Sequence, residues 1–119
     1  MDDRLTVGGH GEDIAAAHLE ATGMVVLERN WRCPQGEIDI VARDGPDLVI
    51  CEVKTRRSAA FGPPASAVTA RKFARLRRLA AAWLRAHPGG FRAVRIDVVA
   101  VVLAPGSPPA VEHLRGVVG

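Results

Sequence analysis

Three polar residues in two neighbouring segments of the chain could carry chemistry together. Asp39 lies in residues 37–42, where acidic and apolar residues alternate, and Glu52 and Lys54 lie in the largely apolar residues 48–55. Both patterns predict strands, and the short turn between them makes the two strands antiparallel neighbours. Since residues two positions apart on a strand lie about 7 Å apart on one face, two carboxylates and an ammonium are expected to converge on one point.

This set of groups suits a divalent cation and a phosphate ester. Carboxylate oxygens and water are ligands that Mg²⁺ prefers, and a bound cation polarises a phosphate oxygen and lowers the pKa of a bound water. Lys54 could orient the nucleophile or neutralise developing charge. The chain has fourteen Arg and two Lys, and lysine is the cation whose pKa responds to its surroundings. A cross-strand ion pair on a solvated face is the alternative.

The net charge of +3 conceals an uneven distribution along the chain. Residues 1–52 carry a net charge of −7, whereas residues 53–96 hold eleven Lys or Arg and no acid. A basic stretch of this kind favours a polyanionic partner, with a solvated helix face as the alternative. The candidates for contacts with nucleic-acid phosphates are Arg56, Arg57, Lys72, Arg75 and Arg78, of which Lys72 is the first choice.

The elements that position these residues follow from periodicity and from turn residues. We expect a helix at 13–21, strands at 24–31, 37–42 and 48–55, a long helix at 65–86, a strand at 94–103 and a short strand at 111–114. This order predicts an α/β fold with a mixed sheet of four or five strands. It also predicts one domain over residues 1–119, with its core at about 8–103 and a C-terminal tail at 104–119 that carries an edge strand.

Composition favours an ordinary folded domain, with 48% hydrophobic and 24% charged residues. No apolar run approaches the roughly 18 residues that a membrane span needs. The first residues are acidic and lack the apolar segment of a secretory signal. We therefore expect a cytoplasmic protein with no membrane partner.

Several short motifs, in this order, resemble the YraN family of bacteria. They are Gly11-Glu12, Asn30, Gly36-Glu37-Ile38-Asp39-Ile40, Glu52-Val53-Lys54-Thr55-Arg56, Phe61-Gly62, Lys72 and Arg95-Ile96-Asp97-Val98. The resemblance extends over nearly the whole chain, and the family is similar to archaeal Holliday-junction resolvases and other proteins of the restriction-endonuclease-like fold. It implies a three-layer α/β/α sandwich with a central mixed β-sheet.

The resemblance also implies a role for each site residue. Asp39 and Glu52 would be the metal-binding carboxylates, the backbone carbonyl of Val53 a further ligand, and Lys54 the catalytic lysine. Glu12 would be an additional acid brought to the metal, which is expected to be Mg²⁺ or Mn²⁺. Without the resemblance, Glu12 could equally be an acid that favours the dipole of a helix N-terminus.

The function expected from these features is a Mg²⁺-dependent, endonuclease-like protein that binds structured or branched DNA and hydrolyses phosphodiester bonds. The alternatives are a nucleic-acid-binding protein that retains the nuclease fold without turnover, and a protein-binding module. Resolvases of this fold act as two-fold dimers because a four-way junction offers two equivalent strands, so the resemblance is compatible with a homodimer.

Overall fold

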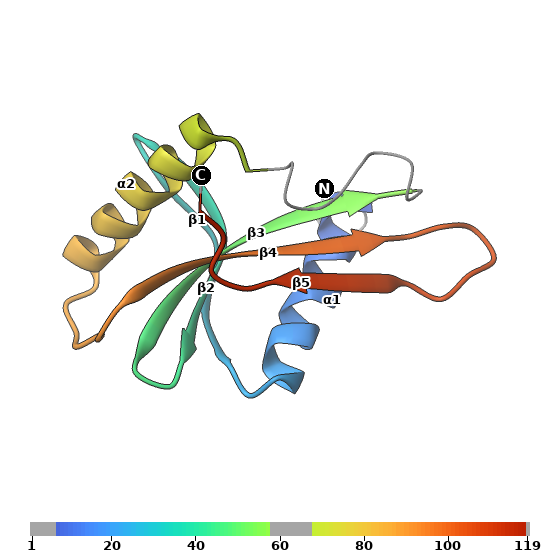
Figure 1. Ribbon diagram of the computed structural model, residues 1–119, viewed down its shortest axis with the longest axis horizontal. Coiled ribbons are helices and arrows are strands. Elements are labelled where there is room, and N and C mark those ends of the chain that lie inside the picture. The colour runs from blue at the N-terminus through green and yellow to red at the C-terminus, as the bar shows by residue number, and fades with distance from the viewer. Residues whose placement is uncertain (1–6, 58–67, 119) are drawn as a thin grey trace.

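A five-stranded mixed sheet with one helix against each face forms the protein in the computed structural model, which describes residues 7–57 and 68–118 (Figure 1). In chain order the elements are α1 (Val7–Ala21), β1 (Val25–Cys33), β2 (Gly36–Asp44), β3 (Asp47–Arg56), α2 (Ala70–Ala86), β4 (Val94–Val102) and β5 (Ala110–Leu114). The predicted order and type of the elements are therefore confirmed, as is the α/β sandwich.

The strands lie in the order β1-β2-β3-β4-β5. Consecutive strands β1, β2 and β3 pair antiparallel, and the two-residue turn between Asp44 and Asp47 contains Gly45 at φ +58°, a left-handed value that glycine adopts without steric cost. Strands β3 and β4 are parallel and are joined through α2, as a crossover requires. Strand β4 is an inner strand, as its nearly continuous apolar sequence predicts, and β5 is the edge strand beyond it.

Two apolar clusters fill the space on either side of the sheet. Helix α1 packs Ala15, Ala16 and Leu19 against one face, together with Ile40 and Cys51 from the strands. Helix α2 covers the other face with the buried residues Leu76, Leu79, Ala80 and Trp83. No helix of the described ranges is long and apolar enough to cross a membrane.

Both helices begin at a different residue from the one that the sequence predicts. Helix α1 begins six residues before the predicted start and ends before Gly23, whose φ of +98° suits the residue after a helix. Helix α2 begins at Ala70 because Thr69 is extended and its side chain accepts a hydrogen bond from the backbone N–H of Lys72. The predicted helical residues 65–67 and the motif residues Phe61-Gly62 lie outside the described residues.

Candidate functional site

The site lies where β2 separates from β3. Their register is regular as far as the pair Ile40 and Cys51, and beyond it a carboxylate oxygen of Asp39 accepts the backbone N–H of Val53 at 2.9 Å. The side chain thus takes the place of a strand carbonyl. Figure 1 shows the far end of the β1–β2 hairpin beside α2, while β3 runs on in another direction.

This separation overturns one detail of the predicted strand. Strict alternation places Ile38 and Ile40 on the same face, but Ile40 packs in the cluster under α1 and Ile38 packs in the cluster under α2. The backbone of β2 therefore turns between these residues. Asp39 lies at the turn, and its side chain lies beside β3 rather than over a face of the sheet.

Five residues line a cavity of about 290 Å³ at this point: Glu12, Asp39, Val53, Lys54 and Thr55. Four of them are predicted site residues, so α1, β2 and β3 bring together groups that the sequence separates by as many as 42 positions. Because the N–H and carbonyl of one strand residue point to the same side of the strand, the Val53 carbonyl also faces the side on which Asp39 lies. Sequence reasoning did not single out Thr55, although it belongs to the same motif.

Glu12 is held in place by β1. One oxygen of its carboxylate accepts hydrogen bonds from the Asn30 side chain at 2.8 Å and from Arg29 Nε at 3.3 Å. Asn30 has a φ of +54°, a value that asparagine tolerates better than most residues. Since α1 begins at Val7 and has no acid in its first turn, the helix-dipole explanation for Glu12 is wrong.

Helix α1 reaches the site because it approaches β3 closely at Gly11. A Cβ atom at this position would overlap the side chain of Thr55, so a larger residue could fit only if Gly11 or Thr55 shifted. The Gly11-Glu12 pair therefore has a physical explanation. Glycine allows the contact with β3, and the next residue supplies the carboxylate.

Glu52 lies on the α2 side of the site. Its carboxylate is 2.8 Å from Lys72 Nζ, with the two side chains only 13% and 18% exposed. Asp39 and Glu52 are the residues next to Ile40 and Cys51, the last pair of the β2–β3 register, and the charge of Glu52 contributes to the raised pKa of Asp39. Lys72 therefore neutralises a carboxylate of the site, and its sequence environment did not reveal this ion pair.

Glu12 pairs with Arg29 and Glu52 pairs with Lys72, whereas Asp39 makes no ion pair with the described residues. Burial, followed by the charge of Glu52, raises the pKa of Asp39 from 3.8 to about 7, and the Val53 N–H only partly opposes this. Burial also raises the pKa of Glu12, against the opposing effect of Arg29 and Asn30. The pKa of Lys54 is lowered by burial and then by the neighbouring Lys72, as suits a lysine that contacts a reacting group.

The donor atoms of the site are of the type that a hard divalent cation prefers, although they do not form a complete coordination site. Carboxylate and carbonyl oxygens are the ligands of Mg²⁺, which commonly binds one or two carboxylates and keeps several waters. Within the described residues, no three His, Cys, Asp or Glu side chains lie close enough together to hold a metal. The oxygen donors nearest to one another are those of Asp39, Glu12 and the Val53 carbonyl, which line the cavity, whereas Glu52 lies outside its lining and is engaged by Lys72.

A second, basic cavity of about 240 Å³ adjoins the start of α2. It is lined by Thr69, Arg71, Lys72, Arg75 and Arg78. Three of the five predicted phosphate contacts therefore lie together. The other two, Arg56 and Arg57, lie at the end of β3, beyond Lys54.

The basic segment is less unpaired than its sequence suggests. Arg92 binds Asp47 at 2.9 Å, and Arg95 binds Asp44 at 3.0 Å, so acids from the first half of the chain neutralise these two arginines. Among the described residues, Arg71, Arg75 and Arg78 make no ion pair. The free positive charge is therefore concentrated on α2.

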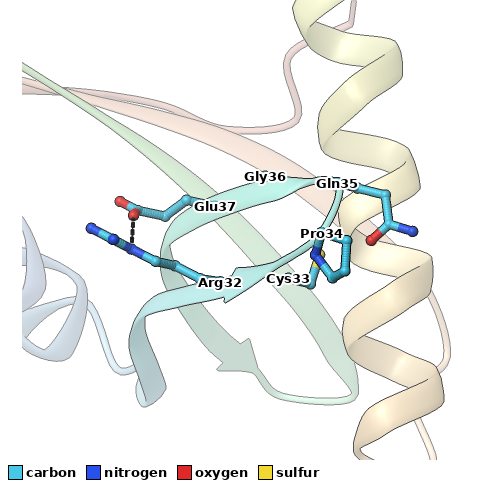
Figure 2. A pocket seen from close by; sticks show the side chains of 6 residues that line it. All are labelled: Arg32, Cys33, Pro34, Gln35, Gly36 and Glu37. Carbon is cyan, nitrogen blue, oxygen red and sulfur yellow. Dashed lines mark hydrogen bonds and ion pairs between the residues drawn. The ribbon is translucent and has the colours of Figure 1, made fainter.

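A third cavity, of about 490 Å³, surrounds the tip of the β1–β2 hairpin (Figure 2). Arg32 and Glu37 point to the same side of the hairpin and form an ion pair at 2.6 Å, away from α2. Glu37 belongs to the same motif as Asp39, but it does not line the carboxylate cavity. Its charge still contributes to the raised pKa of Asp39.

Asp97 is the buried charge that sequence reasoning did not assign. It is fully buried and accepts hydrogen bonds from two nitrogens of Arg95, from the backbone N–H of Gly116 at 3.0 Å and from His113 at 2.8 Å. The second ring nitrogen of His113 lies 3.2 Å from His18 on α1. The signals in the sequence were the charged residues Arg95 and Asp97 in an otherwise apolar strand and their place in one of the motifs of the resemblance.

Comparison with known proteins gives a match over most of the chain. Residues 11–101 match the model described as "Uncharacterised protein family UPF0102". A UPF0102 protein of Beutenbergia cavernae is 60% identical over 117 residues, which cover 98% of this chain and 99% of the relative. UPF0102 proteins of Streptomyces coelicolor and Frankia alni are 57% and 56% identical, and the alignments cover 98% of this chain and 92% and 97% of the relatives.

Proposed function

The chain belongs to the uncharacterised protein family UPF0102, the YraN family that its motifs resemble, and from its site we propose that it is a Mg²⁺-dependent, endonuclease-like protein. Its substrate would be structured or branched DNA, and its reaction the hydrolysis of a phosphodiester bond. The observation that carries the proposal is the shared cavity of Glu12, Asp39, Val53 and Lys54 at the point where β2 leaves β3. The three-layer arrangement is compatible with the restriction-endonuclease-like fold.

The carboxylates and the lysine divide the chemistry between them. Asp39 and Glu52, with Glu12 and the Val53 carbonyl, would hold Mg²⁺ or Mn²⁺. When bound, the ion would polarise a phosphate oxygen and lower the pKa of a water molecule. Lys54 lies in the same cavity, and its ammonium would orient the attacking water or neutralise the charge that develops on the phosphate.

The substrate would be held by the basic residues that flank this cavity. Arg75 and Arg78 on α2 are free of ion pairs with the described residues, and Arg56 and Arg57 follow Lys54 along β3. Phosphate contacts of this kind position a nucleic acid without reading its sequence. They support recognition of the shape of the DNA rather than of a base sequence.

The deciding experiment incubates the purified protein with labelled four-way junction, duplex and single-stranded DNA, in Mg²⁺, in Mn²⁺ and in EDTA. We expect cleavage of the branched substrate with either metal and none in EDTA. Asp39→Asn and Lys54→Ala are expected to lower the rate by about 10²–10³-fold, the usual cost of losing one group that stabilises the transition state.

The matched control is Asp47→Asn, which removes a carboxylate from the opposite end of β3 that pairs with Arg92 outside the cavity. It should cleave like the parent protein. If no substrate is cut, or if Asp39→Asn and Lys54→Ala cut as fast as the parent, catalysis by this site is wrong.

A nucleic-acid-binding protein without turnover is the second candidate, and the basic cavity on α2 favours it because that cavity needs no metal. This candidate predicts DNA binding that weakens steeply with salt. It also predicts the same affinity in EDTA as in Mg²⁺, and the same affinity for Glu52→Ala as for the parent. Binding that depends on both the metal and Glu52 would argue against it.

A further inference from the structure

Lys72 belongs to two neighbouring sites at once. Its ammonium is 2.8 Å from a carboxylate oxygen of Glu52, in an ion pair with both side chains less than a fifth exposed. The same residue lines the basic cavity of α2 with Thr69, Arg71, Arg75 and Arg78. It is the member of that cavity that has a carboxylate partner among the described residues.

Lys72 and a divalent cation would compete for the carboxylate of Glu52. Two cations on one buried carboxylate repel each other strongly, because the repulsion is poorly screened where water is largely excluded. Lysine has a compact charge on a flexible stem of four carbons, so it can leave one anion and reach another. In the basic cavity beside it, the positive charges of the arginines are uncompensated, since these residues have no anionic partner within the described part of the chain.

We propose that Lys72 exchanges between two anions: it binds Glu52 while no divalent cation is present, and it binds a phosphate group of the nucleic acid in the α2 cavity once the cation has taken Glu52. This inference rests on the proposed function and adds a coupling between its two ligands. The ammonium acts as a stand-in for the cation and so keeps Glu52 neutralised in the free protein. Lys72 is accordingly a positioning residue.

The exchange makes the binding of cation and DNA mutually reinforcing. A cation that displaces Lys72 increases the charge available to the phosphates, and a phosphate that holds Lys72 leaves Glu52 open to the cation. Because linkage is reciprocal, each ligand must raise the affinity for the other by the same factor. We expect a factor of about 5, at the lower end of typical couplings.

The test measures Mn²⁺ affinity by electron paramagnetic resonance, and DNA affinity by fluorescence anisotropy with a short four-way junction at constant ionic strength. Lys72→Gln should bind Mn²⁺ about 3–10-fold more tightly and DNA about 3–10-fold more weakly, with the coupling lost. Lys72→Arg keeps the charge and should stay close to the parent. Arg85→Gln removes an exposed charge from the last turn of α2 and should leave the affinity for Mn²⁺ unchanged.

A second variant tests the same exchange from the other partner. Glu52→Gln releases Lys72 without a metal, so it should raise the metal-free affinity for DNA, and the double variant with Lys72→Gln should not. Glu112→Gln, an exposed residue of β5, removes the same charge elsewhere and is the control. Thermal unfolding of each variant establishes that it is folded.

The opposite changes in Mn²⁺ and DNA affinity distinguish exchange from a structural role, which would weaken both or neither. If Lys72→Gln binds Mn²⁺ no more tightly than the parent, or retains the full coupling, the exchange is wrong while the cation site stands. If neither protein binds Mn²⁺, the cation site of the proposed function fails, and the exchange fails with it.

Discussion

A fully buried carboxylate and a half-buried one on the same sheet have opposite surroundings. Asp97 on β4 accepts hydrogen bonds from Arg95, Gly116 and His113, and these donors hold its pKa below the ordinary value although burial opposes them. Asp39 on β2 accepts a hydrogen bond from the backbone of Val53, and burial with the nearby Glu52 raises its pKa to about 7. One carboxylate is neutralised by the protein itself, and the other is not.

The difference is the one expected between a structural charge and a functional one. A buried charge costs several kcal/mol unless donors compensate it, and Asp97 has those donors from β4 and from the chain after β5. Asp39 lacks such donors, and a bound divalent cation would compensate its charge instead. A raised pKa beside a second carboxylate and a lysine is accordingly a stronger indication of function than burial alone.

The largest expected effect is the loss of stability on substitution of Asp97. Asp97→Asn leaves Arg95 and His113 without their shared anion, so it should lower the free energy of unfolding by about 3–5 kcal/mol. Urea denaturation at pH 7 measures this. Asp47→Asn, at the pair with the exposed Arg92, should cost less, about 1 kcal/mol. Equal decreases in the free energy of unfolding of the two variants would show that Asp97 has no special structural role.

Asp39→Asn should raise the free energy of unfolding rather than lower it. A folded pKa of about 7 against the ordinary value of 3.8 means that Asp39 contributes stability below pH 4, and that this contribution is lost as the pH rises through 7. The amide does not ionise, so the variant should match the parent at pH 4 and exceed it by up to about 4 kcal/mol at pH 8 without metal. Thermal or urea unfolding across this range follows the difference.

Divalent cations sharpen the same prediction. Saturating Mg²⁺ should stabilise the parent at pH 8 and leave Asp39→Asn nearly unchanged, because a ligand that binds only the folded state raises its stability. A parent protein that is stabilised no more than the variant would show that Asp39 holds no cation. A gap between the two proteins that fails to grow with pH would show that its pKa is not raised.

The smallest expected effect concerns the delivery of Glu12 to the site. Gly11→Ala places a methyl group against Thr55, and such overpacking should cost about 1–2 kcal/mol. Adding Thr55→Ser, which removes the methyl group of Thr55 but keeps its hydroxyl, should recover only part of this loss, whereas Thr55→Gly should recover more. Urea unfolding of the single and double variants measures both. If Gly11→Ala costs nothing, the close approach of α1 to β3 does not limit the position of Glu12.

Much of the fold could be predicted because its signals are local. The alanine-rich first helix, the alternation around Asp39 and the turn before Asp47 each constrain the backbone within a few residues. The prediction of strict alternation was wrong at Ile38, where β2 turns away from β3 toward α2. No local pattern marks that turn, because it results from packing against a helix that begins more than thirty residues later.

The sequence by itself determined the order of the elements, the types of the candidate site residues and the family. Only the tertiary structure decided which charges are compensated: Asp97 by Arg95 and His113, Glu52 by Lys72, and Asp39 by little more than one backbone N–H. The physical reason is that periodicity depends on neighbours along the chain. Compensation depends on donors that arrive from other strands and helices, and the composition of a segment does not reveal them.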